Sequence, residues 1–170
     1  MDLDRTLAVV PLFVIAGLVV IAWLMDWGRD SDRRAVLVLG VVAALVALAG
    51  NQLLGHFYYR PRPFLVLDVH RIIPHSRETS MYSDHTAVAG ALTASLLAAR
   101  RWWLGAAAVL LTIAVGIARV GAAIHYPSDV AAGAAAGAVA LLVLLPLKRF
   151  ASRPVAGLMS VERRLYARQA

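Results

Sequence analysis

Long stretches without a charged side chain constrain the fold of this chain more than any other feature of its sequence. Residues 6–25 are 20 residues that include no Asp, Glu, Lys or Arg. As a helix they would be about 30 Å long, which matches the hydrocarbon thickness of a bilayer. Four further stretches share this character, at residues 35–59, 86–99, 102–118 and 130–147. The stretch at residues 86–99 is short, and we expect its helix to begin near Ser83. The sequence therefore predicts an all-α fold, a polytopic membrane helix bundle of about five transmembrane helices, with six as the alternative.

The composition excludes the main classes of soluble protein. Hydrophobic residues make up 61% of the chain and charged residues 16%, against about 45–50% and about 25% in soluble domains. A soluble domain of 170 residues has too little interior to bury that much apolar surface. The absence of cysteine excludes a disulfide scaffold. The net charge of +7 would suggest nucleic acid in a soluble chain, but these cations flank apolar stretches. We therefore expect membrane lipids as partners and no nucleic acid.

The basic residues divide unequally between the two sides that five spans define. Eleven fall on the side that holds the C-terminus: Arg29, Arg33, Arg34, Arg100, Arg101, Lys148, Arg149, Arg153, Arg163, Arg164 and Arg168. Six fall on the other side: Arg5, Arg60, Arg62, Arg71, Arg77 and Arg119. By the positive-inside rule the side with eleven is cytoplasmic. We therefore expect the N-terminus and the connections at 56–85 and 119–129 to lie outside, and the C-terminus inside. All five histidines fall on the outer side.

The last apolar stretch and the tail behind it have distinct compositions. Gly133 and Gly137 belong to a pattern of small residues four apart, which favours close helix packing within the bundle. Dimerisation through this surface is the alternative, and the sequence leaves the oligomeric state open. Residues 151–170 are basic and carry scattered apolar residues, which predicts either a helix on the anionic cytoplasmic leaflet or a frayed tail. We assign residues 1–150 to a transmembrane domain and residues 151–170 to this tail.

The segment His125-Tyr126-Pro127-Ser128-Asp129 joins the fourth and fifth stretches. Proline favours the first position of a helix, so the fifth helix is predicted to start at Pro127. Asp129 would then be its third residue, where a carboxylate can reach back towards the residues before the helix. A carboxylate bonded to one imidazole nitrogen leaves the other nitrogen available as a nucleophile. Arg119 ends the fourth stretch and can meet the same site. The alternative is a plain helix cap with a snorkelling arginine.

Two further polar clusters are predicted on the same side. Ser83-Asp84-His85-Thr86 opens the third stretch, where free N–H groups and the helix dipole favour a phosphate. A histidine placed there could protonate a leaving oxygen. Arg60-Pro61-Arg62-Pro63 follows the second stretch, and its guanidinium groups suit phosphate oxygens. Taken singly, helix capping explains the first cluster and a solvated loop explains the second. The connection from residue 60 to residue 83 is predicted to be irregular throughout.

Together the three clusters predict a site for phosphoryl transfer. They offer a nucleophile, an acid and cations that can stabilise the equatorial phosphate oxygens. No Walker sequence or carboxylate cluster indicates ATP or bound Mg²⁺. The spacing of the histidines does not suit zinc. We therefore expect neither a metal nor a cofactor.

At these residues the sequence resembles the type 2 phosphatidic acid phosphatase superfamily, which also includes vanadium haloperoxidases. Its third signature, Ser-Arg-x5-His-x3-Asp, matches residues 118–129 with alanine in place of the serine. Its second, Pro-Ser-Gly-His, appears as Tyr82-Ser83-Asp84-His85. Of its first, Lys-x6-Arg-Pro, only Arg62-Pro63 is present. The residues considered as stand-ins for the missing lysine are Asn51, Gln52, Arg60, Arg71 and Arg77. Residues 58–64, 83–85 and 125–129 are similar to the bacitracin-resistance type of undecaprenyl pyrophosphate phosphatase.

The resemblance implies a metal-independent lipid phosphatase with a covalent intermediate. His125 would attack the terminal phosphorus and form a phosphohistidine, with Asp129 orienting its ring. His85 would protonate the departing lipid phosphate and then activate water. Five residues would bind the phosphate: Arg60, Arg62, Arg119, Ser83 and Asp84.

The function that this resemblance implies is hydrolysis of undecaprenyl pyrophosphate to undecaprenyl phosphate and phosphate. The reaction would take place at the outer face of a bacterial inner membrane, and residues 1–150 would be the phosphatase domain. Such a step belongs to lipid carrier recycling in cell wall biogenesis and to bacitracin resistance. One alternative is a phosphatase of another lipid phosphate: phosphatidylglycerophosphate, phosphatidic acid or a polyprenyl-phosphoryl sugar phosphate. The other alternative is a non-enzymatic transporter that binds phospholipid headgroups.

Overall fold

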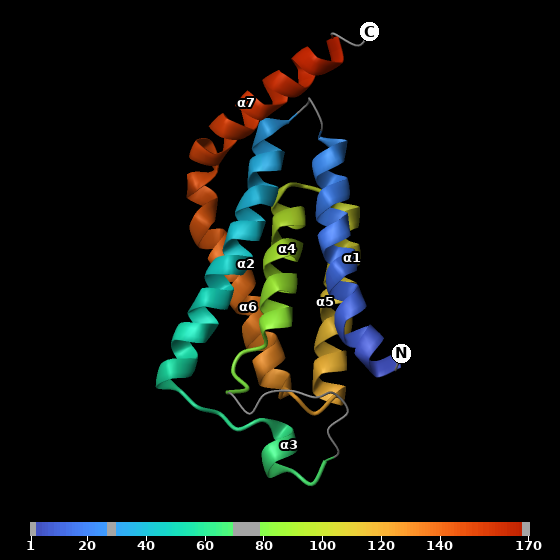
Figure 1. The fold of residues 1–170 in the computed structure, drawn as a ribbon, viewed down its shortest axis with the longest axis vertical. Coiled ribbons are helices and arrows are strands. Elements are labelled where there is room, and N and C mark those ends of the chain that lie inside the picture. The colour runs from blue at the N-terminus through green and yellow to red at the C-terminus, as the bar shows by residue number, and fades with distance from the viewer. Residues whose placement is uncertain (1–2, 27–29, 70–78, 168–170) are drawn as a thin grey trace.

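The computed structural model describes residues 3–26, 30–69 and 79–167, with side chains from residue 10 to residue 161 of these ranges. Within them every regular element is a helix (Figure 1), so the predicted all-α fold is confirmed for this part of the chain. The helices are α1 (Leu3–Met25), α2 (Ser31–Phe57), α3 (Pro63–Val66), α4 (Asp84–Ala98), α5 (Trp102–Gly121), α6 (Pro127–Leu144), the 3-10 helix η1 (Leu145–Leu147) and α7 (Lys148–Ala167).

The five apolar stretches correspond to α1, α2, α4, α5 and α6, and α4 lies at the centre of the bundle (Figure 1). It packs against α1, α2, α5 and α6. With 15 residues, α4 is about 22 Å long, shorter than the hydrocarbon core of a bilayer. Because the longer helices surround α4, its polar first turn can lie below their ends without meeting lipid. The bundle can therefore hold a polar site at the start of α4.

Small residues bring α4 and α6 into close contact. Gly137 is buried, and a Cβ atom built on it would lie 2.0 Å from the carbonyl oxygen of Ala87. On the other helix, a Cβ atom on Gly90 would lie 2.3 Å from the carbonyl oxygen of Ala134. Backbone atoms thus occupy the space that larger side chains would need. The predicted use of Gly133 and Gly137 in packing within the bundle is confirmed.

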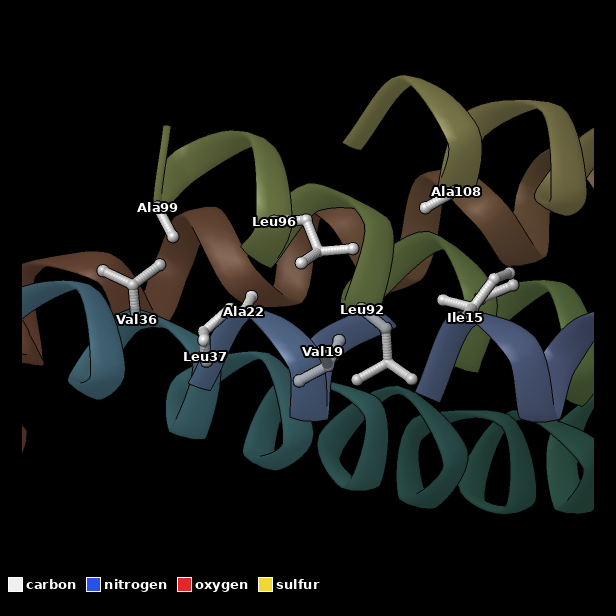
Figure 2. Packing of buried hydrophobic residues seen from close by; sticks show 10 residues of the cluster. Ile15, Val19, Ala22, Val36, Leu37, Leu92, Leu96, Ala99 and Ala108 are labelled. Carbon is white, nitrogen blue, oxygen red and sulfur yellow. The ribbon is translucent and has the colours of Figure 1, made fainter. Parts of the chain in front are cut away.

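A hydrophobic cluster joins α1, α2, α4 and α5 on the other side of α4 (Figure 2). Its fully buried members include Ile15, Ala22 and Leu96. Large apolar residues on the outside of the bundle remain exposed, among them Leu45, Leu110 and Val143. An apolar core with an apolar exterior is the arrangement of a protein that a bilayer surrounds.

Within the described part of the chain, three helical runs are long and apolar enough to cross a membrane: Ser31–Phe57, Trp102–Gly121 and Pro127–Val161. The last of them joins α6, η1 and most of α7. The described apolar part of α1, Val10–Met25, is shorter, and so is α4. The chain is thus a multi-pass membrane protein, and the count of five spans stays a prediction.

The basic tail is helical and contacts the bundle. α7 begins at Lys148, whose Nζ atom lies 2.9 Å from a carboxylate oxygen of Asp32. Val155 and Met159 are buried in a cluster with Ala35 of α2. The tail therefore packs on α2 with one face, while Phe150 and other apolar residues of α7 stay exposed. Binding of α7 to an anionic leaflet remains a prediction.

One end of the bundle gathers the polar connections (Figure 1). The end of α2, the start of α4, the end of α5 and the start of α6 meet there, beside α3. The connection predicted to be irregular contains one short helix in its described part, α3, while residues 70–78 lie outside the described residues. α1 starts at this same end, and α7 runs towards the opposite one (Figure 1).

Candidate active site

His125 lies in the short connection between α5 and α6. Ala123 has a φ of 57°, which turns the chain after α5, and Pro127 is the first residue of α6, as the sequence predicted. His125 is buried, with 5% of its surface exposed. Its Nδ1 atom lies 2.8 Å from the carbonyl oxygen of Ser80. Because a carbonyl oxygen can only accept, Nδ1 carries the hydrogen, and the lone pair of the neutral ring is on Nε2.

Asp129 is fully buried and binds two other groups. Its Oδ2 atom accepts a hydrogen bond of 2.9 Å from the N–H of Tyr126, so the carboxylate reaches back over the helix start. Its Oδ1 atom lies 2.5 Å from a guanidinium nitrogen of Arg60. The distance from Oδ2 to Nδ1 of His125 is 3.9 Å, which exceeds a hydrogen bond. The sequence predicted Asp129 as the group that orients His125, whereas in the structure Nδ1 of His125 donates its hydrogen bond to the Ser80 carbonyl.

Arg62 and Arg119 bring two buried guanidinium groups to the same place. Arg62 precedes α3, and one of its nitrogens donates a 2.9 Å hydrogen bond to the carbonyl oxygen of Ile124. The same nitrogen lies 3.4 Å from Nε2 of His125. Arg119 is in the last turn of α5 and close enough to Arg62 for their charges to repel. Two adjacent buried cations cost free energy that a bound anion would offset.

The start of α4 forms another wall of the site. Ser83 precedes the helix, and its buried hydroxyl makes no hydrogen bond to the described residues. Its N–H donates to the carbonyl oxygen of Asp129 at 3.1 Å, which joins α4 to α6. Asp84 accepts a hydrogen bond of 2.7 Å from the side chain of Asn51. His85 lies in the first turn of α4 and lines the cavity described below.

Asn51, in the last two turns of α2, holds the segment before α4. Its side-chain oxygen accepts a 2.7 Å hydrogen bond from the N–H of Tyr82. Its amide nitrogen donates to the carbonyl oxygen of Tyr82 at 2.8 Å and to Asp84. Both amide hydrogens are thereby used, so Asn51 cannot act as a further donor in place of the missing lysine. The Tyr82 hydroxyl donates to the carbonyl oxygen of Ala47, one turn earlier in α2.

The hydroxyl of Tyr82 has a shifted pKa, and burial is the main cause of the shift. Burial raises the pKa of the Tyr82 hydroxyl above its usual value, and the nearby Asp84 carboxylate adds to the effect. The hydroxyl therefore stays protonated and keeps donating to Ala47.

These groups border a cavity of about 360 Å³, lined by Asn51, Gln52, Gly55, His56, Tyr59, Arg62, Thr79, Tyr82, Asp84, His85 and His125. Its size falls at the lower end of small-ligand pockets. Four of the eight predicted site residues line it: Arg62, Asp84, His85 and His125. The other four, Arg60, Ser83, Arg119 and Asp129, are not among its lining residues. Arg71 and Arg77 lie outside the described residues.

On the α2 side of the cavity, Asn51 and Gln52 were candidates for the place of the missing lysine, whereas His56 was not predicted as a site residue. Gln52 and His56 are one turn apart, so they share a face of the helix. The Nδ1 atom of His56 lies 2.8 Å from the carbonyl oxygen of Gln52 and donates to it, which leaves Nε2 for other partners. Among the described residues, no group of three or more His, Cys, Asp or Glu is arranged to hold a metal ion.

The sequence pattern of the PAP2 superfamily matches residues 34–153, from the start of α2 to the first part of α7. The chain belongs to the PAP2 superfamily. Its matched region holds every residue of the cavity and all three predicted signatures.

Curated relatives narrow the resemblance within the PAP2 superfamily. The chain is 32% identical to undecaprenyl-diphosphatase BcrC of Bacillus subtilis over 69% of its own length and 60% of that protein. It is 29% identical to the putative undecaprenyl-diphosphatase YbjG of Escherichia coli, over 80% of this chain and 65% of that one. It is 34% identical to the bacitracin transport permease protein BcrC of Bacillus licheniformis, over 76% and 62%. The chain thus spans less than two thirds of each of these relatives. No solved structure matches it.

Several residues of this candidate site were missed or only partly identified from the sequence. Ser80 acts through a backbone carbonyl, which residue type does not reveal. Tyr82 was noted only where a proline was expected, and its contacts to α2 gave no separate signal. Gln52 and Asn51 were found by counting back from Arg62, but nothing in the spacing showed that only Asn51 would be bound to Tyr82.

Proposed function

We propose that this protein hydrolyses a lipid pyrophosphate, undecaprenyl pyrophosphate in the first place, to the lipid phosphate and inorganic phosphate. The observation that carries the proposal is the placement of Arg62 3.4 Å from Nε2 of His125, at the wall of a cavity that His85 also lines. A lone pair, a guanidinium group and a possible acid thus face the same space, as phosphoryl transfer requires. Two relatives carry the name undecaprenyl-diphosphatase, which supports this substrate class.

In the first step Nε2 of His125 attacks the terminal phosphorus. A P–N bond forms while the bond from phosphorus to the bridging oxygen breaks. His85 gives its proton to that oxygen as the lipid phosphate departs. Arg62 and Arg119 stabilise the charge on the equatorial oxygens. The product on the enzyme is a phosphohistidine whose Nδ1–H still donates to the Ser80 carbonyl.

In the second step water replaces the imidazole on phosphorus. His85, now neutral, accepts a proton from the water as the new P–O bond forms and the P–N bond breaks. Phosphate leaves, His125 returns to its neutral form, and His85 is protonated again. The second phosphate of the substrate lies against the α2 wall of the cavity, where the side-chain amide of Gln52 can donate a hydrogen bond.

The deciding experiment is phosphate release from undecaprenyl pyrophosphate by purified protein in detergent with excess EDTA. Wild-type turnover is expected to persist, and His125→Gln is expected to lose it by at least about a thousandfold because the nucleophile is gone. The matched control is His56→Gln, which alters a histidine of the same cavity outside the proposed chemistry. Equal losses in both variants would contradict the assignment of His125.

The dependence on pH provides a second measurement. His125 must be neutral to attack and His85 must be protonated to donate, so kcat/KM is expected to follow a bell-shaped profile. A monotonic profile between pH 5 and pH 9 would count against this pair of roles.

Two alternative functions also fit the site or the named relatives. The chemistry of the site fits other lipid phosphates equally well, and a panel with phosphatidylglycerophosphate, phosphatidic acid and polyprenyl-phosphoryl sugar phosphates distinguishes them. One relative is named a bacitracin transport permease protein, which favours a transport role. That role predicts headgroup binding without phosphate release and no effect of His125→Gln on transport.

A further inference from the structure

We propose that Arg60 is a positioning residue for His125 and not a ligand of the substrate phosphate. In this arrangement it neutralises Asp129 and leaves the imidazole bound to the Ser80 carbonyl. The catalytic meaning of this inference rests on the proposed function, whereas the geometry stands without it. Arg60 sits only two residues before Arg62, but its guanidinium group binds Asp129 at the start of α6.

The side chain of Arg60 is bound to the first turn of α6. One guanidinium nitrogen lies 2.5 Å from Oδ1 of Asp129 and 2.9 Å from the hydroxyl of Ser128. The guanidinium carbon lies 4.1 Å from the centre of the Tyr126 ring, a distance suited to a cation–π contact. The side chain is 29% exposed, while that of Asp129 is fully buried. These contacts hold the Asp129 carboxylate in a fixed place beside a cation.

The backbone of Arg60 binds the segment that orients His125. Its N–H donates to the hydroxyl of Thr79 at 3.1 Å, and its carbonyl oxygen accepts from the N–H of Ser80 at 2.8 Å. The Ser80 carbonyl then accepts from Nδ1 of His125. Arg60 therefore contacts both groups that can bind Nδ1: it holds Ser80 in place through its backbone and Asp129 through its side chain.

The electrostatic consequence follows from these distances. A buried carboxylate 3.9 Å from Nδ1 would stabilise the imidazolium form of His125. The Arg60 cation opposes that effect, so the imidazole stays neutral and its Nε2 lone pair remains available. Among the described residues, the other titratable or charged groups near His125 and around its cavity are Arg62, Arg119, Asp84, His85, His56, Tyr59, Tyr82 and Tyr126. Arg60→Gln keeps all of these residues and removes only the charge of Arg60.

The test is an NMR titration of protein labelled with ¹⁵N-histidine in detergent, which needs no substrate. The signal of His125 is assigned by its loss in His125→Gln. In Arg60→Gln the midpoint of His125 is expected to rise by about one pH unit, because Asp129 loses its cation. Arg60→Lys keeps the charge and is expected to stay within about 0.3 units of wild type. The matched control is Arg153→Gln, an exposed arginine of α7.

Two further variants that carry Asp129→Asn complete a double-mutant cycle with Arg60→Gln. Asp129→Asn leaves the Arg60 cation uncompensated and is expected to lower the midpoint of His125. The double variant Arg60→Gln with Asp129→Asn removes both charges and is expected to return it towards wild type. An unchanged midpoint in Arg60→Gln would overturn the proposal, as would a rise that persists in the double variant. If Arg60→Gln does not fold, Asp129→Asn decides, and an unchanged midpoint there overturns the proposal.

Kinetics separate positioning from phosphate binding. In Arg60→Gln the acid limb of kcat/KM is expected to move to higher pH by the same amount as the NMR midpoint, with KM near wild type above that limb. A rise of KM of about tenfold at every pH, with no change in the NMR midpoint, would make Arg60 a phosphate ligand and overturn the proposal. A failure of the proposed function would look different: wild-type protein would release no phosphate, while the NMR shift would still appear.

Discussion

The side-chain amide of Asn51 holds the segment before α4 in place and has no role in the proposed reaction steps. It binds the N–H and the carbonyl oxygen of Tyr82 and one oxygen of Asp84. Asn51→Ala would leave these three groups without partners, and we expect it to lower the free energy of unfolding by about 1–3 kcal/mol. Because Asp84 and His85 begin α4, kcat should fall as well.

The matched control for Asn51→Ala is Gln52→Ala, at the next position of α2. Gln52 is exposed and lines the cavity, so its loss should raise KM and leave thermal stability near wild type. Thermal unfolding in detergent and phosphate release measure the two effects. Equal stability of the two variants would contradict the structural role of Asn51.

Tyr82 leads to a prediction about alkaline pH. Burial and the Asp84 carboxylate raise the pKa of its hydroxyl in the folded protein. The protonated hydroxyl therefore contributes stability that is complete below the unfolded value of about 10 and is lost as the pH rises through the folded value. We expect wild type to lose thermal stability more steeply than Tyr82→Phe as the pH rises above about 10. Parallel losses in the two proteins would contradict a shifted Tyr82.

At this scale the sequence predicted residue types better than it predicted partners. His125, His85 and Arg62 were found from their spacing, and all three line the cavity. The Ser80 carbonyl escaped notice because every residue carries a carbonyl group. The bond from Arg60 to Asp129 joins residues 69 positions apart, and only the folded chain brings them together. Spacing along the chain therefore identified candidates, while their contacts required the structure.

At the scale of helices, the contact between α4 and α6 depends on glycine. Gly137→Ala would place a methyl group 2.0 Å from the carbonyl oxygen of Ala87, an atom that cannot move aside without shifting α4. We expect a loss of about 1–3 kcal/mol in the free energy of unfolding. The matched control is Gly17→Ala in α1, where a Cβ atom meets nothing within 4 Å. Thermal unfolding in detergent compares the two, and equal melting temperatures would contradict the tight contact.

Helix positions followed from the sequence where local signals were strong. The start of α6 at Pro127 was predicted from proline's preference for the first turn, and α4 begins one residue after Ser83 as expected. The predicted second stretch ran to residue 59, but α2 ends at Phe57 and the chain is already extended at Tyr58. An apolar composition marks a membrane stretch without marking where the helix ends, because aromatic residues suit both the last turn and the interface. The packing of α7 on α2 is tertiary, and local sequence carries little signal for it.

For the molecule as a whole, the two ends of the bundle differ in how many of their basic side chains are exposed. At the site end, Arg62 and Arg119 are buried and Arg60 binds Asp129. At the other end Arg34 is fully buried, but Arg100, Arg149 and Arg153 are exposed. Asp26 and Arg101 form a partly buried ion pair there, and Lys148 binds Asp32. Exposed cations at that end suit contact with an anionic leaflet, which supports its assignment to the cytoplasm.

This orientation can be measured because the chain contains no cysteine. Asp68→Cys places a thiol on an exposed position after α3, at the site end, and Ala156→Cys places one on an exposed position of α7. In intact cells a membrane-impermeant maleimide is expected to label position 68 and to label position 156 only after permeabilisation. The cysteine-free parent provides the background. The reverse pattern would put the site in the cytoplasm, where a substrate presented at the outer leaflet could not reach His125, and the proposed outer-face reaction would fail with it.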